Sequence, residues 1–355
     1  MPPNILLARD YGAKDLAALR RTGDYTNVRR GAIVRASEAK QTWARADHLS
    51  LARCVAVAAE LTCSFAFSHE SAVLIHGGWI DHPTDVVHIS QTNTPRVLRH
   101  SDIRRHHASD LTPADVVEVN GLPVTSLERT ALDCALSLRP RRALVAVDSL
   151  LRLRIKPSRE RKDDFRDGIA RAIRDLLAEL ENRPVRRGLK GAREIIRHAD
   201  PLSESAGESW LRWIALAFGL PRPQTQLRVV TDAGPKWVDM GWMVEGDDVD
   251  FVRLGAEYDG RSKYAQQPQG GGRAKYSRRS GDGARSEEIA SGDALFHEKV
   301  REDSLRRAGV HTERFVHQQL RDPGAAFARL YAAFPESARP MLRPRPALRT
   351  FTGRR

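Results

Sequence analysis

Three strand-like runs between residues 226 and 259 constrain the fold of this chain more than any other feature. QLRVVTD, KWVDMGWMV and VDFVRLGAEYD are rich in β-branched and aromatic residues, and the turn sequences DAGP and EGDD separate them. The last two runs predict a hairpin about residue 248, in which residues whose numbers sum to 496 lie opposite each other. Asp239 then lies opposite Glu257, and Asp259 points to the same face because side chains alternate along a strand. The hairpin therefore brings three carboxylates together.

Three crowded carboxylates destabilise a hairpin unless a cation lies between them. Mg²⁺, or Mn²⁺ in its place, takes oxygen ligands and keeps water in its remaining positions. A metal-bound water is more acidic and can attack a phosphodiester, so a metal site of Asp239, Glu257 and Asp259 suits phosphodiester cleavage. The alternative is an exposed face on which these acids pair with nearby basic residues, namely Lys236, Arg253 or Lys263. Both interpretations are open at this stage.

The charge distribution favours nucleic acid as a partner. The chain of 355 residues carries a formal charge of +13, and its excess of basic residues is concentrated in residues 1–53, in residues 151–200 and in the tail from Ala338. Basic segments of this kind commonly meet phosphates, although a solvated basic surface remains the alternative. No apolar run is long enough for a membrane span, and the N-terminus lacks a leader pattern, so we expect a cytoplasmic protein with no membrane partner.

The first 38 residues predict a DNA-binding head. An amphipathic helix precedes NVRRGAIVR, whose alternation around Gly31 predicts two short strands and a tight turn. A helix followed by a basic two-stranded wing is the layout of a winged helix-turn-helix. The alternative is a basic hairpin that caps the next domain. In the DNA-binding interpretation the first three of the following residues reach a groove and the last three hold phosphates: Lys14, Arg20, Arg21, Arg29, Arg30 and Arg35.

Residues 39–152 predict a mixed α/β domain without a recognisable catalytic pattern. Its histidines have no acidic partner at a diagnostic spacing, and surface or core positions are expected for them. The order of GDYTNVRRGAIVR, FSHESAVLIHG, VHIS, GLPVTSLERTALDCA and AVDSLLR resembles the AbiEi-type antitoxins and related regulators over about residues 5–152. The resemblance implies a winged-helix head and a repressor of a toxin operon, with a cognate toxin protein as a further partner. Residues 153–200 predict a charged helical linker.

Residues 201–334 carry a second resemblance. GESWLR, WVDMGW, GAEYDGRSKY and FHEKVREDSLRRAGV, in this order, resemble the PD-(D/E)XK nucleases, especially the branch related to very-short-patch-repair endonucleases. The resemblance implies a restriction-endonuclease-like αβββαβ core, a divalent metal and hydrolysis of DNA. Asp259 stands where most of that superfamily has lysine, so Lys263 or Lys299 would have to orient the attacking water. The implied catalytic set is Glu208, Asp239, Glu257, Asp259, Lys263 and Lys299.

Together these features predict a multidomain α/β (α+β) protein that binds DNA and hydrolyses phosphodiester bonds as a magnesium-dependent endodeoxyribonuclease. Lys299 and Arg301 lie on the expected last helix, where they contact a scissile phosphate or form ordinary ion pairs along the helix. The loop 264–288 is expected to be mobile, and the basic tail 335–355 to be disordered. The alternative function is an antitoxin-like transcriptional repressor whose nuclease fold is inactive, and a third is a middle domain that binds a toxin directly.

Overall fold

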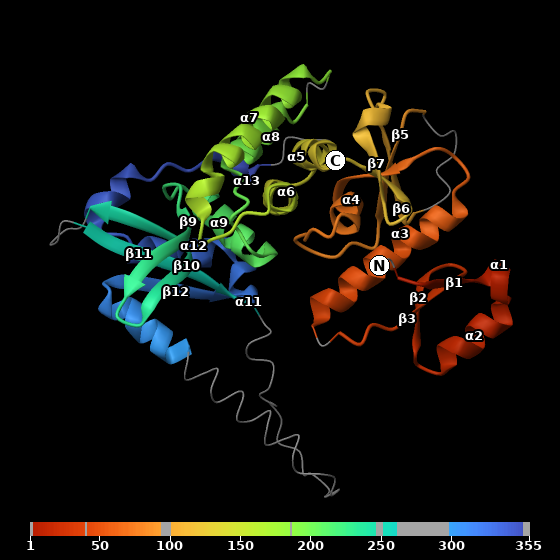
Figure 1. Cartoon of the computed structure of the whole chain (residues 1–355), viewed down its shortest axis with the longest axis horizontal. Coiled ribbons are helices and arrows are strands. Elements are labelled where there is room, and N and C mark those ends of the chain that lie inside the picture. Colours follow the sequence, from red (N-terminus) through yellow and green to blue (C-terminus); the bar gives the residue numbers. More distant parts are fainter. Residues whose placement is uncertain are drawn as a thin grey trace, which may run out of the picture. The chain divides into compact units, whose positions relative to one another are not determined.

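The computed structural model describes residues 3–39, 41–93, 101–184, 187–245, 251–260 and 298–350. The chain is a mixed α/β protein with three sheets, as the sequence predicts at this coarse level. It divides into two compact units (Figure 1). The first comprises Met1–Trp213 together with Arg345–Arg355, and the second comprises Ile214–Pro344. Within the described residues, no helix has both the length and the apolar character that crossing a membrane requires.

The N-terminal head is a three-stranded antiparallel sheet in the order β1-β3-β2, with two short helices between β1 and β2. Its apolar face packs through Val28, Ala32 and Val34 against the small residues of the long helix α3 (Thr42–Glu60). Gly31 adopts a positive φ of 76° in the tight turn between β2 and β3. The elements of the head are β1 (Ile5–Leu7), α1 (Ala8–Tyr11), α2 (Ala13–Arg21), β2 (Tyr25–Arg29) and β3 (Ala32–Arg35).

A five-stranded sheet forms the middle of the first unit, in the order β6-β5-β4-β8-β7. Helix α4 (His69–Ile75) is buried along its whole length and follows β4 directly. The core joins Phe67 and Ile89 of the sheet to Cys54 and Val57 of α3, so the sheet and the head share one supporting helix. The strands are β4 (Ala66–Phe67), β5 (Val87–Gln91), β6 (Ile103–His107), β7 (Val116–Val119) and β8 (Leu122–Thr125).

Helices complete the first unit. Asp148 of α6 is fully buried and forms an ion pair with Arg212, which is also buried. Leu176 and Leu180 of α7 are buried as well, so the charged segment 153–200 has an apolar side within the unit. The helices are α5 (Leu127–Ser137), α6 (Pro140–Ile155), α7 (Arg166–Asn182) and α8 (Leu189–His198), with 3₁₀ turns at η1 (Pro113–Asp115) and η2 (Lys162–Phe165).

The second unit is built on a four-stranded sheet in the order β12-β11-β10-β9. Helix α9 (Ala206–Phe218) precedes it, and a helix over residues 298–307 lies between β11 and β12 in the chain. The predicted hairpin register is confirmed, because Met240 pairs with Ala256 and Gly241 with Gly255. The remaining elements are β9 (Gln224–Thr231), β10 (Gly234–Glu245), β11 (Phe251–Asp259), β12 (Val310–Val316), α11 (His317–Leu320) and α12 (Pro323–Ala333).

The basic tail departs from the disorder predicted for residues 335–355. The structure places a 3₁₀ helix η4 (Glu336–Met341) and a short helix α13 (Pro346–Arg349) there. Leu348 is fully buried, and its carbonyl accepts a hydrogen bond of 2.8 Å from the indole Nε1 of Trp213. The composition predicts disorder because arginine and proline dominate the tail, but the buried side chains of Ala338 and Leu348 and the hydrogen bonds around them give it ordered turns. Residues 351–355 and the loop 264–288 lie outside the described residues.

Candidate carboxylate and arginine site

The sheet of the second unit sets two acids and one arginine in a row across three neighbouring strands. The printed register of β10 and β11 ends at Met240 and Ala256, and Asp239 and Glu257 are the next residues on those strands. On the other side, Glu257 pairs with Arg314 across the parallel ladder between β11 and β12. Because paired residues in adjacent strands share a face, Asp239, Glu257 and Arg314 belong to one face of the sheet.

Glu257 is the centre of this row. Its side chain is buried, with 4% of the residue exposed. Arg301, from the helix 298–307, donates hydrogen bonds to both carboxylate oxygens, of which the one to Oε2 measures 3.0 Å. Arg314 lies 3.3 Å from Oε2. A charge-assisted bidentate pair of this kind fixes the orientation of the carboxylate.

Two further acids surround the arginines. Glu298 contacts both Arg301 and Arg314, and Asp259 lies 4.0 Å from Nη1 of Arg314. Arg301 also donates to the carbonyl of Trp237 at 2.7 Å, so its guanidinium joins the helix to β10. Burial lowers the pKa of Arg301, but hydrogen bonding and the charge of Glu257 outweigh it, and the net shift is upward. Both arginines therefore remain charged.

Asp239 lacks a direct arginine contact among the hydrogen bonds and ion pairs of the described residues. Its Oδ2 accepts a hydrogen bond of 2.7 Å from the backbone N–H of Tyr258. Burial raises the pKa of this carboxyl to about 7, and the charges of Glu257 and Asp259 act in the same direction. The Tyr258 N–H and the charge of Arg301 lower it only in part. The carboxyl of Asp239 therefore titrates close to neutral pH, and a further cation nearby would favour its ionised form.

The donor set suits a hard divalent cation by chemistry and charge. Four carboxylates face two guanidinium groups, so the cluster carries an excess of negative charge when all the acids are ionised. The three carboxylates are farther apart than the ligands of one bound metal ion, since the ligand oxygens of Asp239, Glu257 and Asp259 do not all lie within 4.8 Å of one another. Both oxygens of Glu257 also accept hydrogen bonds from Arg301, whose positive charge opposes a cation at the same carboxylate. The residues fit the ion, and the arginines compete with it.

The hydrogen bonds and ion pairs described for this row do not involve the remaining predicted catalytic residues. Glu208 belongs to the first unit, where its carboxylate accepts hydrogen bonds from the N–H of Glu204 at 2.7 Å and from Ser205 Oγ at 2.9 Å. These contacts satisfy the start of α9, as in a capping box. Lys299 is exposed on the helix 298–307. Lys263 lies outside the described residues.

One predicted DNA contact is wrong. The side chain of Arg29 is only 7% exposed, and it forms ion pairs with Glu60 at 2.9 Å and with Asp102 at 3.1 Å. Sequence alternation placed Arg29 on the outer surface of the wing, but the register shifts between Asn27 and Arg29, and the guanidinium turns toward acids far along the chain. Arg29 is therefore a structural residue of the first unit and is unable to hold a phosphate.

The other basic residues of the head are accessible. Lys14, Arg20, Arg21, Arg30 and Arg35 are exposed. Arg20 donates to Asn27 Oδ1 at 3.1 Å, which links the end of α2 to β2. Arg35 lies 3.9 Å from Glu38, a weak surface ion pair. These five side chains are accessible on α2 and on the β2–β3 hairpin.

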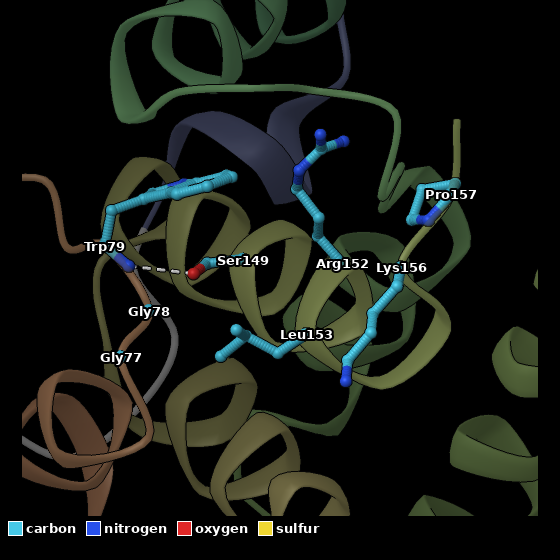
Figure 2. A pocket seen from close by; sticks show the side chains of 8 residues that line it. All are labelled: Gly77, Gly78, Trp79, Ser149, Arg152, Leu153, Lys156 and Pro157. Carbon is cyan, nitrogen blue, oxygen red and sulfur yellow. Dashed lines mark hydrogen bonds between the residues drawn. The ribbon is translucent and has the colours of Figure 1, made fainter. Parts of the chain in front are cut away.

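A cavity of about 280 Å³ lies in the first unit and contains none of the predicted site residues. Figure 2 shows Ser149 on one side of it, accepting a hydrogen bond of 2.8 Å from the backbone N–H of Trp79. Arg152 points into the same region but donates to the carbonyl of Pro201 at 3.1 Å. The cavity lacks a carboxylate, imidazole or thiol in its lining, which consists of Gly77, Gly78, Trp79, Ser149, Arg152, Leu153, Lys156 and Pro157.

Sequence reasoning missed Arg314 and Glu298 as members of the site. Arg314 lies beside Glu257 because β12 runs parallel to β11 after a crossover. No turn sets the register of such a pair, so the sequence does not predict which residue of β12 lies next to Glu257. Glu298 precedes Arg301 by three residues on one helix, and this spacing was visible in the sequence as an ion-pair pattern. The pattern predicts an ion pair between Glu298 and Arg301 on the helix surface, but it does not indicate that Arg301 contacts Glu257 and Glu298 contacts Arg314 on the sheet.

Two curated relatives match part of the sequence. Both are uncharacterized proteins of Mycobacterium tuberculosis, one from strain CDC 1551 / Oshkosh and one from strain ATCC 25618 / H37Rv. Each is 32% identical over 151 residues, which is 41% of this chain and 46% of the relative. The chain therefore spans about half the length of the curated relatives it matches. No protein-family model and no solved structure match the sequence.

Proposed function

We propose that the protein binds DNA through its N-terminal head and that its second unit hydrolyses phosphodiester bonds with a divalent metal ion. The observation that carries the proposal is the row of Asp239, Glu257 and Arg314 across three strands. Burial raises the pKa of Asp239 to about 7, with a smaller contribution from the charges of Glu257 and Asp259, and a bound cation would favour its ionised form. Perturbed carboxyls of this kind concentrate at functional sites.

The order of elements in the chain supports the nuclease hypothesis. From α9 through β9, β10 and β11 to the helix 298–307 and β12, the sequence of elements is α, β, β, β, α, β. This is the order that the resemblance to PD-(D/E)XK nucleases implies. The two acids also occupy the central strands β10 and β11, where that resemblance expects them.

Asp239, Glu257 and Asp259 are the residues that would hold Mg²⁺ or Mn²⁺. A bound ion of this type supplies an acidified water and offsets charge on the phosphate. Arg314 and Arg301 stand beside the same acids, where a phosphate oxygen of the substrate would take over part of their hydrogen bonding. The buried backbone N–H of Tyr258 orients the carboxylate of Asp239.

The head supports DNA binding by its layout. Its sheet order β1-β3-β2, with α1 and α2 between β1 and β2, is compatible with a winged helix-turn-helix. Exposed Lys14 lies at the start of α2 and exposed Arg30 at the turn of the hairpin. The helix is the part that would enter a groove, and the hairpin is the wing that would hold phosphates.

A cleavage assay on supercoiled and linear plasmid tests this proposal, with Mg²⁺, Mn²⁺ or EDTA in parallel. Metal-dependent cleavage that disappears in Asp239→Asn and Glu257→Gln is the expected result. Glu313→Gln is the matched control, because Glu313 lies on β12 but pairs with Arg329 outside the row. Cleavage that survives in both variants would exclude this site. Calorimetry with Mg²⁺ on the same variants reports the metal site without relying on turnover.

A second candidate function is DNA binding without hydrolysis, as in a transcriptional repressor with an inactive nuclease fold. The specific observation in its favour is that Arg301 occupies both oxygens of Glu257. In that case the arginines keep the carboxylate of Glu257 occupied permanently. Well-folded protein that shifts DNA on a gel but neither binds Mg²⁺ nor cleaves plasmid would favour this function.

A further inference from the structure

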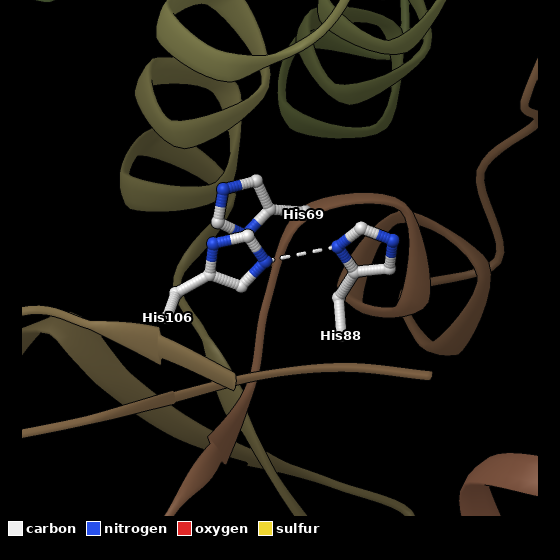
Figure 3. A group of neighbouring side chains, drawn as sticks. All are labelled: His69, His88 and His106. Atoms are coloured by element: carbon white, nitrogen blue, oxygen red, sulfur yellow. Dashed lines mark hydrogen bonds between the residues drawn. The ribbon is translucent and has the colours of Figure 1, made fainter. Parts of the chain in front are cut away.

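Three histidines from distant parts of the sequence meet in the first unit. His69 begins α4, His88 lies on β5 and His106 lies on β6 (Figure 3). One ligand nitrogen from each ring lies within 4.8 Å of one nitrogen from each of the others. Among the described residues, no other group of three His, Cys, Asp or Glu side chains reaches this spacing. The cluster is separate from the acids of the second unit and plays no part in the proposed hydrolysis.

We propose that His69, His88 and His106 form a binding site for a divalent transition-metal ion of the zinc type. Imidazole nitrogen is the ligand that Zn²⁺ and its neighbours in the first transition row take most readily after thiolate. Three imidazoles and a water complete a tetrahedral site with one open position. The ligand is therefore a borderline metal rather than Mg²⁺, which prefers oxygen.

The spacing of His88 and His106 is close to that of two ligands on one metal ion. Nδ1 of His88 and Nε2 of His106 are 3.0 Å apart. Two nitrogens at about 2.0–2.1 Å from one tetrahedral zinc ion lie roughly 3.4 Å from each other. The pair therefore needs to open by only a few tenths of an ångström. Binding also requires the ring that donates the hydrogen between them to carry it on its other nitrogen, a change of tautomer without a change of charge.

The third ring is held against the pair. His69 stacks on His106 with ring centroids 3.7 Å apart, and Figure 3 shows it directly above that ring. Its two nitrogens lie 2.9 Å from Ser68 Oγ and 3.3 Å from Ser137 Oγ. Because the lone pair of an imidazole nitrogen lies in the ring plane, the His69 ring must tilt out of the stack and release one hydroxyl before it can bind the metal, and the other hydroxyl can then orient it. The backbone of His69 has a positive φ of 52°, a conformation that histidine adopts at a cost.

The environment favours neutral imidazole, which is the form that binds a metal. Burial lowers the pKa of His88 to about 3 and that of His106 to about 4, with further lowering from the charge of Arg104. His106 is the accessible ring, because it is only half-buried and belongs to the edge strand β6.

Cys63 is not a fourth ligand in this arrangement. Its thiol accepts a hydrogen bond from Gln91, which lies on the face of β5 opposite to His88. Arg104 opposes a cation by its charge, but its exposed position places solvent around the guanidinium. The three imidazoles remain the protein ligands, and the open position belongs to water.

The test uses untagged full-length protein that has been treated with a chelator and then titrated with Zn²⁺ by calorimetry and with Co²⁺ by absorption spectroscopy. One tight site per chain and the visible bands of tetrahedral Co²⁺ are expected. His106→Gln should lose both signals, whereas His107→Gln, the next residue on β6, should keep them. Asp239→Asn should also keep them, which separates this site from the proposed nuclease site.

A second variant guards against an effect on folding. His106→Cys keeps a ligand at the same position, so it should still bind Co²⁺ and add a thiolate-to-cobalt charge-transfer band in the near ultraviolet. That band would identify residue 106 as a ligand directly. Absence of Zn²⁺ and Co²⁺ binding by folded wild-type protein would overturn the proposal, as would unchanged binding by His106→Gln.

Discussion

Arg301 and Glu257 are 44 residues apart in the sequence, yet the guanidinium of Arg301 donates to both oxygens of the Glu257 carboxylate. The pair connects the helix 298–307 to the central strand β11. It satisfies a buried acid, and it occupies the oxygens that a metal ion would need. The same contact therefore stabilises the second unit and sets the competition at its proposed site.

Arg301→Gln should destabilise the second unit in EDTA by about 3 kcal/mol, because it leaves a buried carboxylate with only Arg314 as a partner. Mg²⁺ should restore part of this loss, since the cation can take the freed oxygens. Hydrogen exchange of the β11 amides, with and without Mg²⁺, measures the local free energy of opening. Arg306→Gln is the control, because Arg306 is exposed on the same helix and pairs with Asp303. Equal protection in wild type and Arg301→Gln would contradict the prediction.

Arg29 and Arg30 are neighbours in the sequence and should behave differently. Arg30→Gln should lower the slope of log affinity against log salt for duplex DNA by about 1, as the loss of one phosphate contact does. Arg29→Gln should leave that slope unchanged and lower the stability of the first unit by about 3 kcal/mol, because Glu60 and Asp102 lose a largely buried partner. Fluorescence anisotropy at several salt concentrations, with urea unfolding in parallel, separates the two effects. A slope that falls equally in both variants would refute the structural role of Arg29.

Glu208 should act as a helix cap. Glu208→Ala removes the acceptor for the Glu204 N–H and the Ser205 hydroxyl, and it should cost about 1 kcal/mol of stability. Glu208→Gln keeps a carbonyl oxygen at that position and should cost less. Urea unfolding of the two variants gives the comparison. A Gln variant with normal stability but no plasmid cleavage would show instead that Glu208 serves the reaction.

The histidine cluster should make the first unit sensitive to acid. Burial is the main reason that the pKa of His88 is lowered to about 3 and that of His106 to about 4. Below pH 6.5 these imidazoles therefore bind protons in the unfolded chain but stay neutral in the folded chain. The free energy of unfolding should therefore decrease as the pH is lowered from 6.5 to 4, by roughly 1.4 kcal/mol per pH unit for each imidazole. Urea unfolding in EDTA should show a shallower pH dependence for His106→Asn than for wild type. His107→Asn, on the neighbouring residue, should retain the wild-type gradient.

Local patterns in the sequence were sufficient for the hairpin. The turn EGDD and the alternation on both sides of it fixed the register, and with it the proximity of Asp239 and Glu257. The basic hairpin of the head was also visible, because Gly31 marks a turn between two alternating runs. In both cases the two paired strands follow each other in the chain, so the short turn sequence between them is sufficient to predict their pairing.

Local sequence patterns do not predict contacts between residues that are far apart in the chain. Arg29 meets Asp102 and Arg301 meets Glu257 only after packing has chosen a register or a helix orientation. The spacing of the three histidines in the sequence matches no metal-binding motif, because one lies at the start of a helix and the other two on separate parallel strands. The parallel pairing of β5 and β6 decides that His88 and His106 share a face, and a single sequence carries no sign of that pairing.

The chain leaves the first unit after Trp213 and returns to it at Arg345. Within the second unit, the N–H of Arg343 donates to the carbonyl of Gly219 at 2.9 Å, and any larger residue at position 219 would collide with the backbone of residues 343 and 344. Within the first unit, the indole Nε1 of Trp213 donates to the carbonyl of Leu348 at 2.8 Å. In each unit the segment that leaves is thus hydrogen-bonded to the segment that returns. Because the second unit is one continuous stretch, Ile214–Pro344, set inside the sequence of the first, a single insertion in an ancestral gene is sufficient to account for the order of the two units along the chain.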